Sequence, residues 1–117
     1  MSTVSPKVLV DGILLSNSAP GSPGLYRVPA SGVDATTIRS IRICNTDSVT
    51  RTVTVYLVKS GDSEAAKNTI IPTVSVGAGG YLADDSIHLL GVGDYISAIA
   101  SAASVVSFRA SGAEILT

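Results

Sequence analysis

The stretch TTIRSIRICNTDSVTRTVTVYLV, which runs from Thr36 to Val58, decides the fold class of this chain. In its second half, from Thr50 to Val58, apolar side chains alternate with threonine and tyrosine at every second position. Successive side chains of a β-strand point to opposite faces, so this pattern predicts a strand with one apolar and one polar face. It is the clearest strand in the sequence.

The first half of the stretch, Thr36–Asn45, predicts a second strand with one irregular position. Ile41 and Ile43 share a face, whereas Ile38 is out of step with them. One extra residue in a strand reverses the alternation, so we expect a β-bulge near Arg39–Ser40. Because a polar turn separates the two halves, we expect them to pair as a long antiparallel hairpin.

The rest of the chain consists of short apolar runs separated by turn-forming residues about every 8–12 positions. This spacing, with abundant Val, Ile, Thr, Ser, Ala and Gly, predicts an all-β protein: a single antiparallel β-sandwich, of jelly-roll or Ig-like type, with about eight strands. The further strands are expected within Lys7–Leu15, Leu25–Val28, Thr69–Val76, Tyr81–Leu82, Ile87–Leu90, Tyr95–Ala102 and Val105–Ala110, the last extended by Ala113, Ile115 and Leu116.

Three local signals refine this prediction. The pair Asp11–Gly12 is typical of a tight hairpin turn, so we expect two short strands within Lys7–Leu15. Pro72 lacks a backbone N–H and places its strand at a sheet edge or a bulge. The charged segment Ser60–Asn68 has little to bury and is expected to be a loop. We divide the chain into an N-terminal strand or arm with its loop (residues 1–24) and the β-sandwich proper (residues 25–117), forming one globular domain.

Composition narrows the classes of partner. The 117 residues are 45% hydrophobic and 15% charged, with a formal net charge of −1. The basic residues are scattered rather than grouped, so we expect no nucleic-acid partner. The apolar runs are too short to span a bilayer, and the N-terminus shows no secretory pattern, so we expect no membrane association and synthesis in the cytoplasm. Cys44 is the single cysteine and cannot form an intrachain disulfide.

The sequence offers few candidates for catalysis. His88 is the only histidine, and Asp84, Asp85 and Ser86 lie close to it in sequence. A serine hydrolase would need a nucleophile elbow, Gly-x-Ser-x-Gly, which does not occur. Cys44 lies within a strand and is read as a small apolar residue. We therefore expect a protein that is not an enzyme and has no catalytic residue.

Metal and cofactor sites are not expected either. The nearby ligand types are Asp84, Asp85, His88 and Asp94, but their spacing fits neither a calcium loop nor a zinc site. Acidic residues in a turn are more often a solvated surface. The glycine-rich segment 77–80 is not followed by a helix, so it is read as a turn rather than a phosphate loop.

Three tyrosines are candidate interface residues: Tyr26, Tyr56 and Tyr95. Tyr56 and Tyr95 lie opposite the apolar stripe of their strands, and tyrosine is enriched at protein interfaces. The alternative is that they are half-exposed strand tyrosines. The low charge and weakly guarded strand edges favour a homo-oligomer such as a trimer, against a monomer whose apolar residues are all internal.

Several segments resemble small structural proteins of tailed-bacteriophage virions. They are Leu25–Ala30 (LYRVPA), Ile38–Thr46, which ends in Asn-Thr, Arg51–Val58 (RTVTVYLV) and the Gly93–Asp94 turn before an Ala/Ser-rich strand. The resemblance covers roughly residues 25–112. It implies a virion protein that binds itself and the major capsid protein or another virion component, first of all a capsid decoration or cement protein. The alternatives are a tail, neck or baseplate adaptor, and a host- or carbohydrate-binding module.

Overall fold

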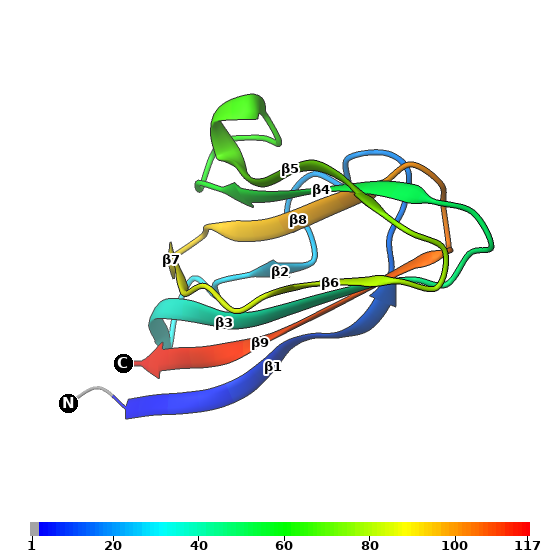
Figure 1. Ribbon diagram of the computed structural model, residues 1–117. Helices are drawn as coiled ribbons and strands as arrows, with labels where there is room; N and C mark the ends of the chain where they lie inside the picture. The colour runs from blue at the N-terminus through cyan, green and yellow to red at the C-terminus, as the bar shows by residue number, and fades with distance from the viewer. Residues whose placement is uncertain (1–2) are drawn as a thin grey trace.

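The computed structural model describes residues 3–117 (Figure 1). Nine β-strands and one short 3-10 helix make up this part of the chain. In chain order they are β1 (Thr3–Leu14), β2 (Tyr26–Arg27), β3 (Val33–Asn45), β4 (Arg51–Val58), η1 (Ala66–Asn68), β5 (Thr69–Val76), β6 (Tyr81–Asp84), β7 (His88–Gly91), β8 (Tyr95–Ala100) and β9 (Val106–Leu116).

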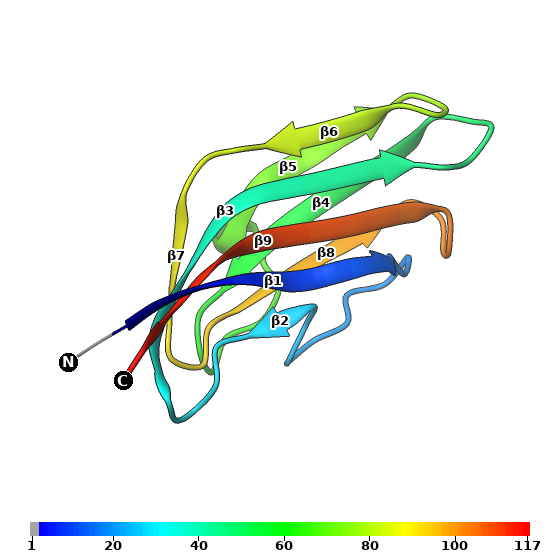
Figure 2. The same ribbon diagram turned by 90° about the horizontal axis from the view of Figure 1, so that it is seen from below.

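The strands form two stacked antiparallel sheets, which confirms the predicted all-β sandwich (Figures 1 and 2). Sheet A has the order β1-β9-β3-β6, and β7 also pairs with β3. Sheet B has the order β2-β8-β4-β5. Strands β6 and β7 pair with successive parts of β3, Ile41–Cys44 and Ala35–Ile38, so together they form one edge of sheet A.

The core lies between the sheets and follows the alternation seen in the sequence. Ile43 of β3 and Phe108 of β9 point inward from sheet A, and Val55 of β4 and Ile96 of β8 point inward from sheet B; all four are fully buried. Each such side chain contributes roughly 1.5–3 kcal/mol relative to an exposed position. The inward direction of these residues leaves their strand neighbours on the outer faces.

The predicted bulge in β3 is confirmed. The pairing of β3 with β9 shifts between Ile38 and Ser40, which leaves Arg39 as the extra residue. Ile38 and Ile41 both point into the core as a result. At this point β9 presents Gly112, where a Cβ would overlap the carbonyl oxygen of Thr37. The bulge and the glycine therefore bring the two strands unusually close together.

The predicted hairpin at Asp11–Gly12 is wrong. Strand β1 is continuous through this pair and remains beside β9 from Thr3 to Leu14, with irregular pairing around Val10. Gly12 has a φ of 61°, a left-handed conformation that serves a bulge as readily as a turn. The described part of the expected N-terminal arm is thus an edge strand of sheet A, followed by a loop over residues 15–25.

The predicted hairpin between β3 and β4 is also wrong, because these strands belong to different sheets. The polar turn after Asn45 crosses from sheet A to sheet B. The buried Asn45 side-chain amide donates hydrogen bonds to the carbonyl oxygens of Val49, Val76 and Gly77 at 2.9, 2.9 and 3.2 Å. These hydrogen bonds attach the segment that crosses between the sheets to the end of β5.

Other local predictions are confirmed. Strand β5, which contains Pro72, lies at the edge of sheet B and pairs irregularly with β4. Strand β9 extends to Leu116, as its last apolar residues suggested. The charged segment 60–68 is a loop that ends in the single turn η1.

The molecule is elongated, with dimensions of 49 × 26 × 20 Å. Thr3 pairs with Leu116, so the described start of the chain and its end lie side by side at one tip (Figure 2). Within residues 3–117 no helix is long and apolar enough to cross a membrane.

Candidate interaction surface

The outer face of sheet A, which points away from the core, carries two groups of side chains. At one end, Arg42 and Arg109 lie among polar and aromatic neighbours. At the other end, apolar side chains of β1 and β7 are exposed. We call the first group the arginine ladder (Asp11, Arg109, Arg42 and Tyr81) and the second group the apolar half (Val4, Pro6, Val8 and Leu89).

The arginine ladder crosses sheet A from edge to edge. Arg42 of β3 and Arg109 of β9 are direct cross-strand partners, and both follow core residues, so both point outward. The Arg42 guanidinium lies 4.6 Å from the ring centre of Tyr81, which is 65% exposed. Arg109 Nη1 lies 3.1 Å from Asp11 Oδ1 at the other edge. The order across the face is thus Tyr81, Arg42, Arg109, Asp11.

Local backbone geometry places Arg109. Its guanidinium lies over Gly12, where a Cβ would come within 2.9 Å of Nη2. The glycine in the irregular part of β1 therefore opens the space that Arg109 uses to reach Asp11. The Asp11–Arg109 pair is exposed to solvent, and such pairs contribute at most about 1 kcal/mol.

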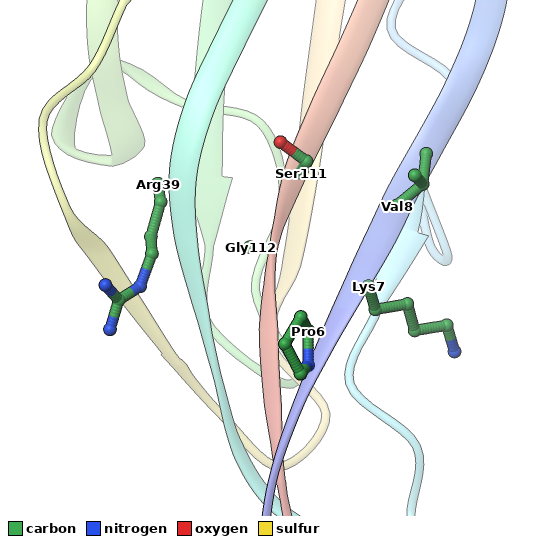
Figure 3. Close-up of a pocket in the computed structure, with 6 residues that line it drawn as sticks. All are labelled: Pro6, Lys7, Val8, Arg39, Ser111 and Gly112. Carbon is green, nitrogen blue, oxygen red and sulfur yellow. The ribbon is translucent and has the colours of Figure 1, made fainter.

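The apolar half occupies the other end of the same face. Val4, Val8 and Leu89 are 62%, 51% and 62% exposed. Between them lie small residues, because Ser40 of β3, Ser111 of β9 and Val8 of β1 are register partners. The sheet surface there is shallow, and an open depression of about 440 Å³ runs over it (Figure 3).

Figure 3 shows how charge borders this depression. The Arg39 side chain extends toward β7, and the Lys7 side chain extends in the opposite direction, beyond β1. Lys7 Nζ lies 3.3 Å from both carboxylate oxygens of the buried Glu114. Arg39 has no ion-pair partner within residues 3–117. The depression is therefore apolar and flanked by one compensated and one uncompensated cation.

The outer face of sheet B is covered in part by the chain itself. Glu64, in the loop before η1, accepts hydrogen bonds from Ser97 Oγ at 2.7 Å, from the Gly21 backbone N–H at 3.0 Å and from the Tyr95 hydroxyl at 3.4 Å. Burial opposes ionisation of Glu64, but these hydrogen bonds outweigh it and hold the pKa of this carboxyl below its ordinary value. We call this arrangement the Glu64 clasp.

The three predicted interface tyrosines are not brought together. Tyr95 is 2% exposed and belongs to the Glu64 clasp, so its ring is not available on the surface of the single chain. Tyr56 is half-buried and pairs with Ser97 in the β4–β8 register, on the outer side of sheet B. Tyr26 is half-buried and takes part in an internal polar cluster. None of the three lies on the outer face of sheet A.

The Tyr26 cluster closes one end of the sandwich. The Tyr26 hydroxyl donates to Glu114 Oε2 at 2.6 Å and lies 2.8 Å from Thr36 Oγ1. Burial, together with the hydrogen bond to the Glu114 carboxylate, raises the pKa of Tyr26 to about 12. The hydroxyl thus stabilises the buried Glu114 carboxylate, a structural role.

The candidates for chemistry have structural partners. His88 Nε2 lies 3.0 Å from Asp84 Oδ2, and no serine, threonine or cysteine side chain of residues 3–117 is hydrogen-bonded to His88. Burial opposes ionisation of Asp84, but the Ser86 N–H and His88 lower its pKa. Asp94 accepts the backbone N–H groups of Gly91 and Ser60, each at 2.9 Å, and so ties two loops together.

Metal-ligating residues do not gather in the described part of the chain. No group of three or more His, Cys, Asp or Glu side chains with metal-site geometry occurs within residues 3–117. Cys44 is a half-buried free thiol on β3, and its register partners are Ser107 and Tyr81.

The arginine ladder was missed from the sequence. Alternation in β3 and β9 shows that Arg42 and Arg109 each point away from the core, but their adjacency depends on a register between distant segments. The sequence around Tyr81 predicts a short strand but no contact between Tyr81 and an arginine. Comparisons of the chain with protein-family models, curated proteins and solved structures find no significant match.

Proposed function

We propose that this chain is a structural protein of a tailed-bacteriophage virion, a capsid decoration or cement protein that binds copies of itself and the major capsid protein. The observation that carries the proposal is the outer face of sheet A. It exposes Val4, Val8 and Leu89 on a broad, shallow surface, next to arginines and an exposed tyrosine. Contiguous exposed apolar side chains with a polar rim are typical of protein interaction sites.

The sequence gives this surface a context. The segments LYRVPA and RTVTVYLV and the Gly93–Asp94 turn resemble those of small phage virion proteins. In the structure these segments lie in and around β2, in β4 and in the turn before β8, away from the outer face of sheet A. The fourth resembling segment, Ile38–Thr46, covers most of β3 and includes Arg42 on that face. The resemblance therefore covers most of the scaffold and one strand of the exposed face.

In the proposed mechanism, each subunit buries surface against its neighbouring copies and further surface against the capsid. A stable interface buries about 800 Å² on each partner, and a molecule that measures 49 × 26 × 20 Å is large enough to offer a surface of that size. Self-association would use the edge of β1, a 12-residue strand whose one neighbour in sheet A is β9. Binding only to the assembled shell stabilises that shell by mass action.

Sedimentation of the purified protein with purified virions or empty capsids of its phage tests the proposal. We expect an oligomer by sedimentation equilibrium and co-sedimentation with the particle. Val8→Asn should weaken co-sedimentation, whereas Val49→Asn, at a loop valine of similar exposure (49% against 51%), should not. A monomer at high concentration that binds neither capsids nor tails would contradict the proposal.

The same preparation distinguishes the position in the particle. Electron microscopy of labelled protein on intact virions should place it on the shell. Label confined to the neck, tail or baseplate would replace the decoration role with that of an adaptor.

A further inference from the structure

We infer that the arginine ladder receives carboxylates of a partner protein, so that the outer face of sheet A docks on an acidic surface with apolar side chains beside it. This inference gives the chemistry of the partner and rests on the proposed function only for the partner's identity.

The arginine ladder destabilises the isolated chain. Arg42 and Arg109 face each other directly across two paired strands, and like charges in that position destabilise a sheet. Asp11 compensates Arg109 alone, and no carboxylate within residues 3–117 pairs with Arg42. An incoming carboxylate between the two guanidinium groups would remove the repulsion.

Both guanidinium groups are held in place before a partner binds. Tyr81 supports the Arg42 guanidinium, and Gly12 provides the space for that of Arg109. A planar guanidinium binds a carboxylate through two parallel hydrogen bonds, and little conformational freedom is lost when the guanidinium is already held in place. Both arginines are therefore prepared to bind a carboxylate.

The apolar half of the face distinguishes between classes of partner. Nucleic acid is disfavoured because the apolar half, with Val4, Val8 and Leu89, would lie against phosphates, and the chain has nine acidic and eight basic residues. A second copy packed face to face would bring the arginines against the same arginines where the two ladders meet, and against apolar side chains where a ladder meets the apolar half. Neither arrangement supplies a carboxylate to Arg42. An acidic and partly apolar protein surface complements both ends of the face.

The test uses poly-L-glutamate as the probe and the complete protein labelled with ¹⁵N. Titration at low salt should shift amide resonances of β1, β3, β6 and β9, and the shifts should diminish at high salt. The double variant Arg42→Gln/Arg109→Gln should bind the probe about tenfold more weakly. The matched control, Arg27→Gln/Lys59→Gln, removes the same charge from β2 and the loop after β4 and should bind within about twofold of the original protein.

Each other outcome overturns the inference. These outcomes are the absence of binding at millimolar probe, shifts centred on sheet B, equal weakening in both double variants, and tighter binding of a DNA oligonucleotide of equal charge. Shifts that depend on protein concentration without probe, and that the ladder variant abolishes, would assign the face to a second copy.

The outcome for particles is separate. A ladder variant that still co-sediments with virions as the original protein does would leave the virion role intact and refute the docking chemistry. Poly-L-glutamate binding through the ladder without any particle binding would support the docking chemistry and refute the virion role.

Discussion

The outer faces of sheets A and B come from similar alternating strands but differ in what covers them. On sheet B, the loops before β2 and before η1 fold back and the Glu64 clasp holds them, so that Ser97 and Tyr95 of β8 are buried on the outer side as well. On sheet A, no segment of residues 3–117 covers Val8, Leu89 or Arg42. The loops before β2 and before η1 thus both cover sheet B, and the outer face of sheet A stays accessible to a partner.

The part of sheet B that the loops leave open has a different character. Thr54 and Thr73 are hydrogen-bonded to each other at 2.7 Å and line a depression of about 250 Å³ together with Asn17, Thr52, Ile99, Ala100 and Ser101. Exposed hydroxyl groups are satisfied by water, whereas exposed valine, leucine and unpaired arginine side chains gain from burial or a counter-charge. Exposure alone does not mark an interaction surface; the chemistry of the exposed groups does.

The largest effect on stability should come from substitution of Gly112, which allows the close approach of β9 and β3 in sheet A. Gly112→Ala places a Cβ against the carbonyl oxygen of Thr37 and the Cα of Ile38, so the strands must separate. We expect a loss of about 3 kcal/mol in the free energy of unfolding, measured with urea. Gly77→Ala is the control, since nothing lies within 4 Å of its Cβ, and it should change stability by less than about 0.5 kcal/mol.

The second largest effect should come from loss of the Glu64 clasp, which holds the loops over sheet B. Glu64→Ala leaves the buried Ser97 hydroxyl without its acceptor and should cost about 2 kcal/mol. Hydrogen exchange should accelerate in loops 16–24 and 59–68 but not in β3 and β9. Asp85→Ala, at an exposed position, is the control. Equal acceleration in both sheets would show that the clasp does not act on sheet B alone.

The same variant has a pH signature. The pKa of Glu64 is lower in the folded chain, so its stabilising contribution is present above the ordinary carboxyl pKa and is lost as pH falls through the folded value. The free energy of unfolding of Glu64→Ala should therefore fall less steeply in acid than that of the original protein.

The third prediction concerns Tyr26, whose hydroxyl serves the interior rather than an outer face. Tyr26→Phe should lower the free energy of unfolding by about 1 kcal/mol at neutral pH. The raised pKa of about 12 means that the folded state holds the Tyr26 proton longer than the unfolded state does, so stability falls as pH rises from the ordinary value of 10.0 toward 12. The Tyr26→Phe variant should not show this fall in stability at alkaline pH. Tyr56→Phe is the control, because its hydroxyl has no hydrogen-bond partner within residues 3–117.

The smallest effect on stability should come from Arg42→Gln. The variant loses the contact with Tyr81 but also the repulsion from Arg109, so we expect a change within about 0.5 kcal/mol by urea unfolding. Weakened poly-L-glutamate binding with unchanged stability would show that Arg42 on the outer face of sheet A serves binding and not the stability of the fold. Destabilisation above about 1 kcal/mol would make Arg42 a structural residue.

The sequence predicts well what depends on neighbours along one strand. Alternation identified the inward side of β3, including the bulge that returns Ile38 to the core, and Pro72 marked an edge strand. These features follow from side-chain parity and from a missing donor, both of which are local.

Features that depend on distant partners were predicted poorly. Asp11–Gly12 looks the same in a hairpin turn and in a bulged strand, and pairing with β9 decides between them. The turn after Asn45 leads to the other sheet, where the Asn45 amide donates hydrogen bonds to carbonyl groups at the end of β5, and this contact joins residues more than 30 positions apart. The arginine ladder likewise needs the β3–β9 register, which no single segment contains.

The adjacency of Thr3 and Leu116 also makes the protein a candidate for circular permutation. A short linker could join the two ends at that tip, and new ends could be opened in the 77–80 turn between β5 and β6, where the side of Gly77 faces open space. Such a rearranged chain would present fused cargo from the opposite end of the sandwich while keeping both sheets intact.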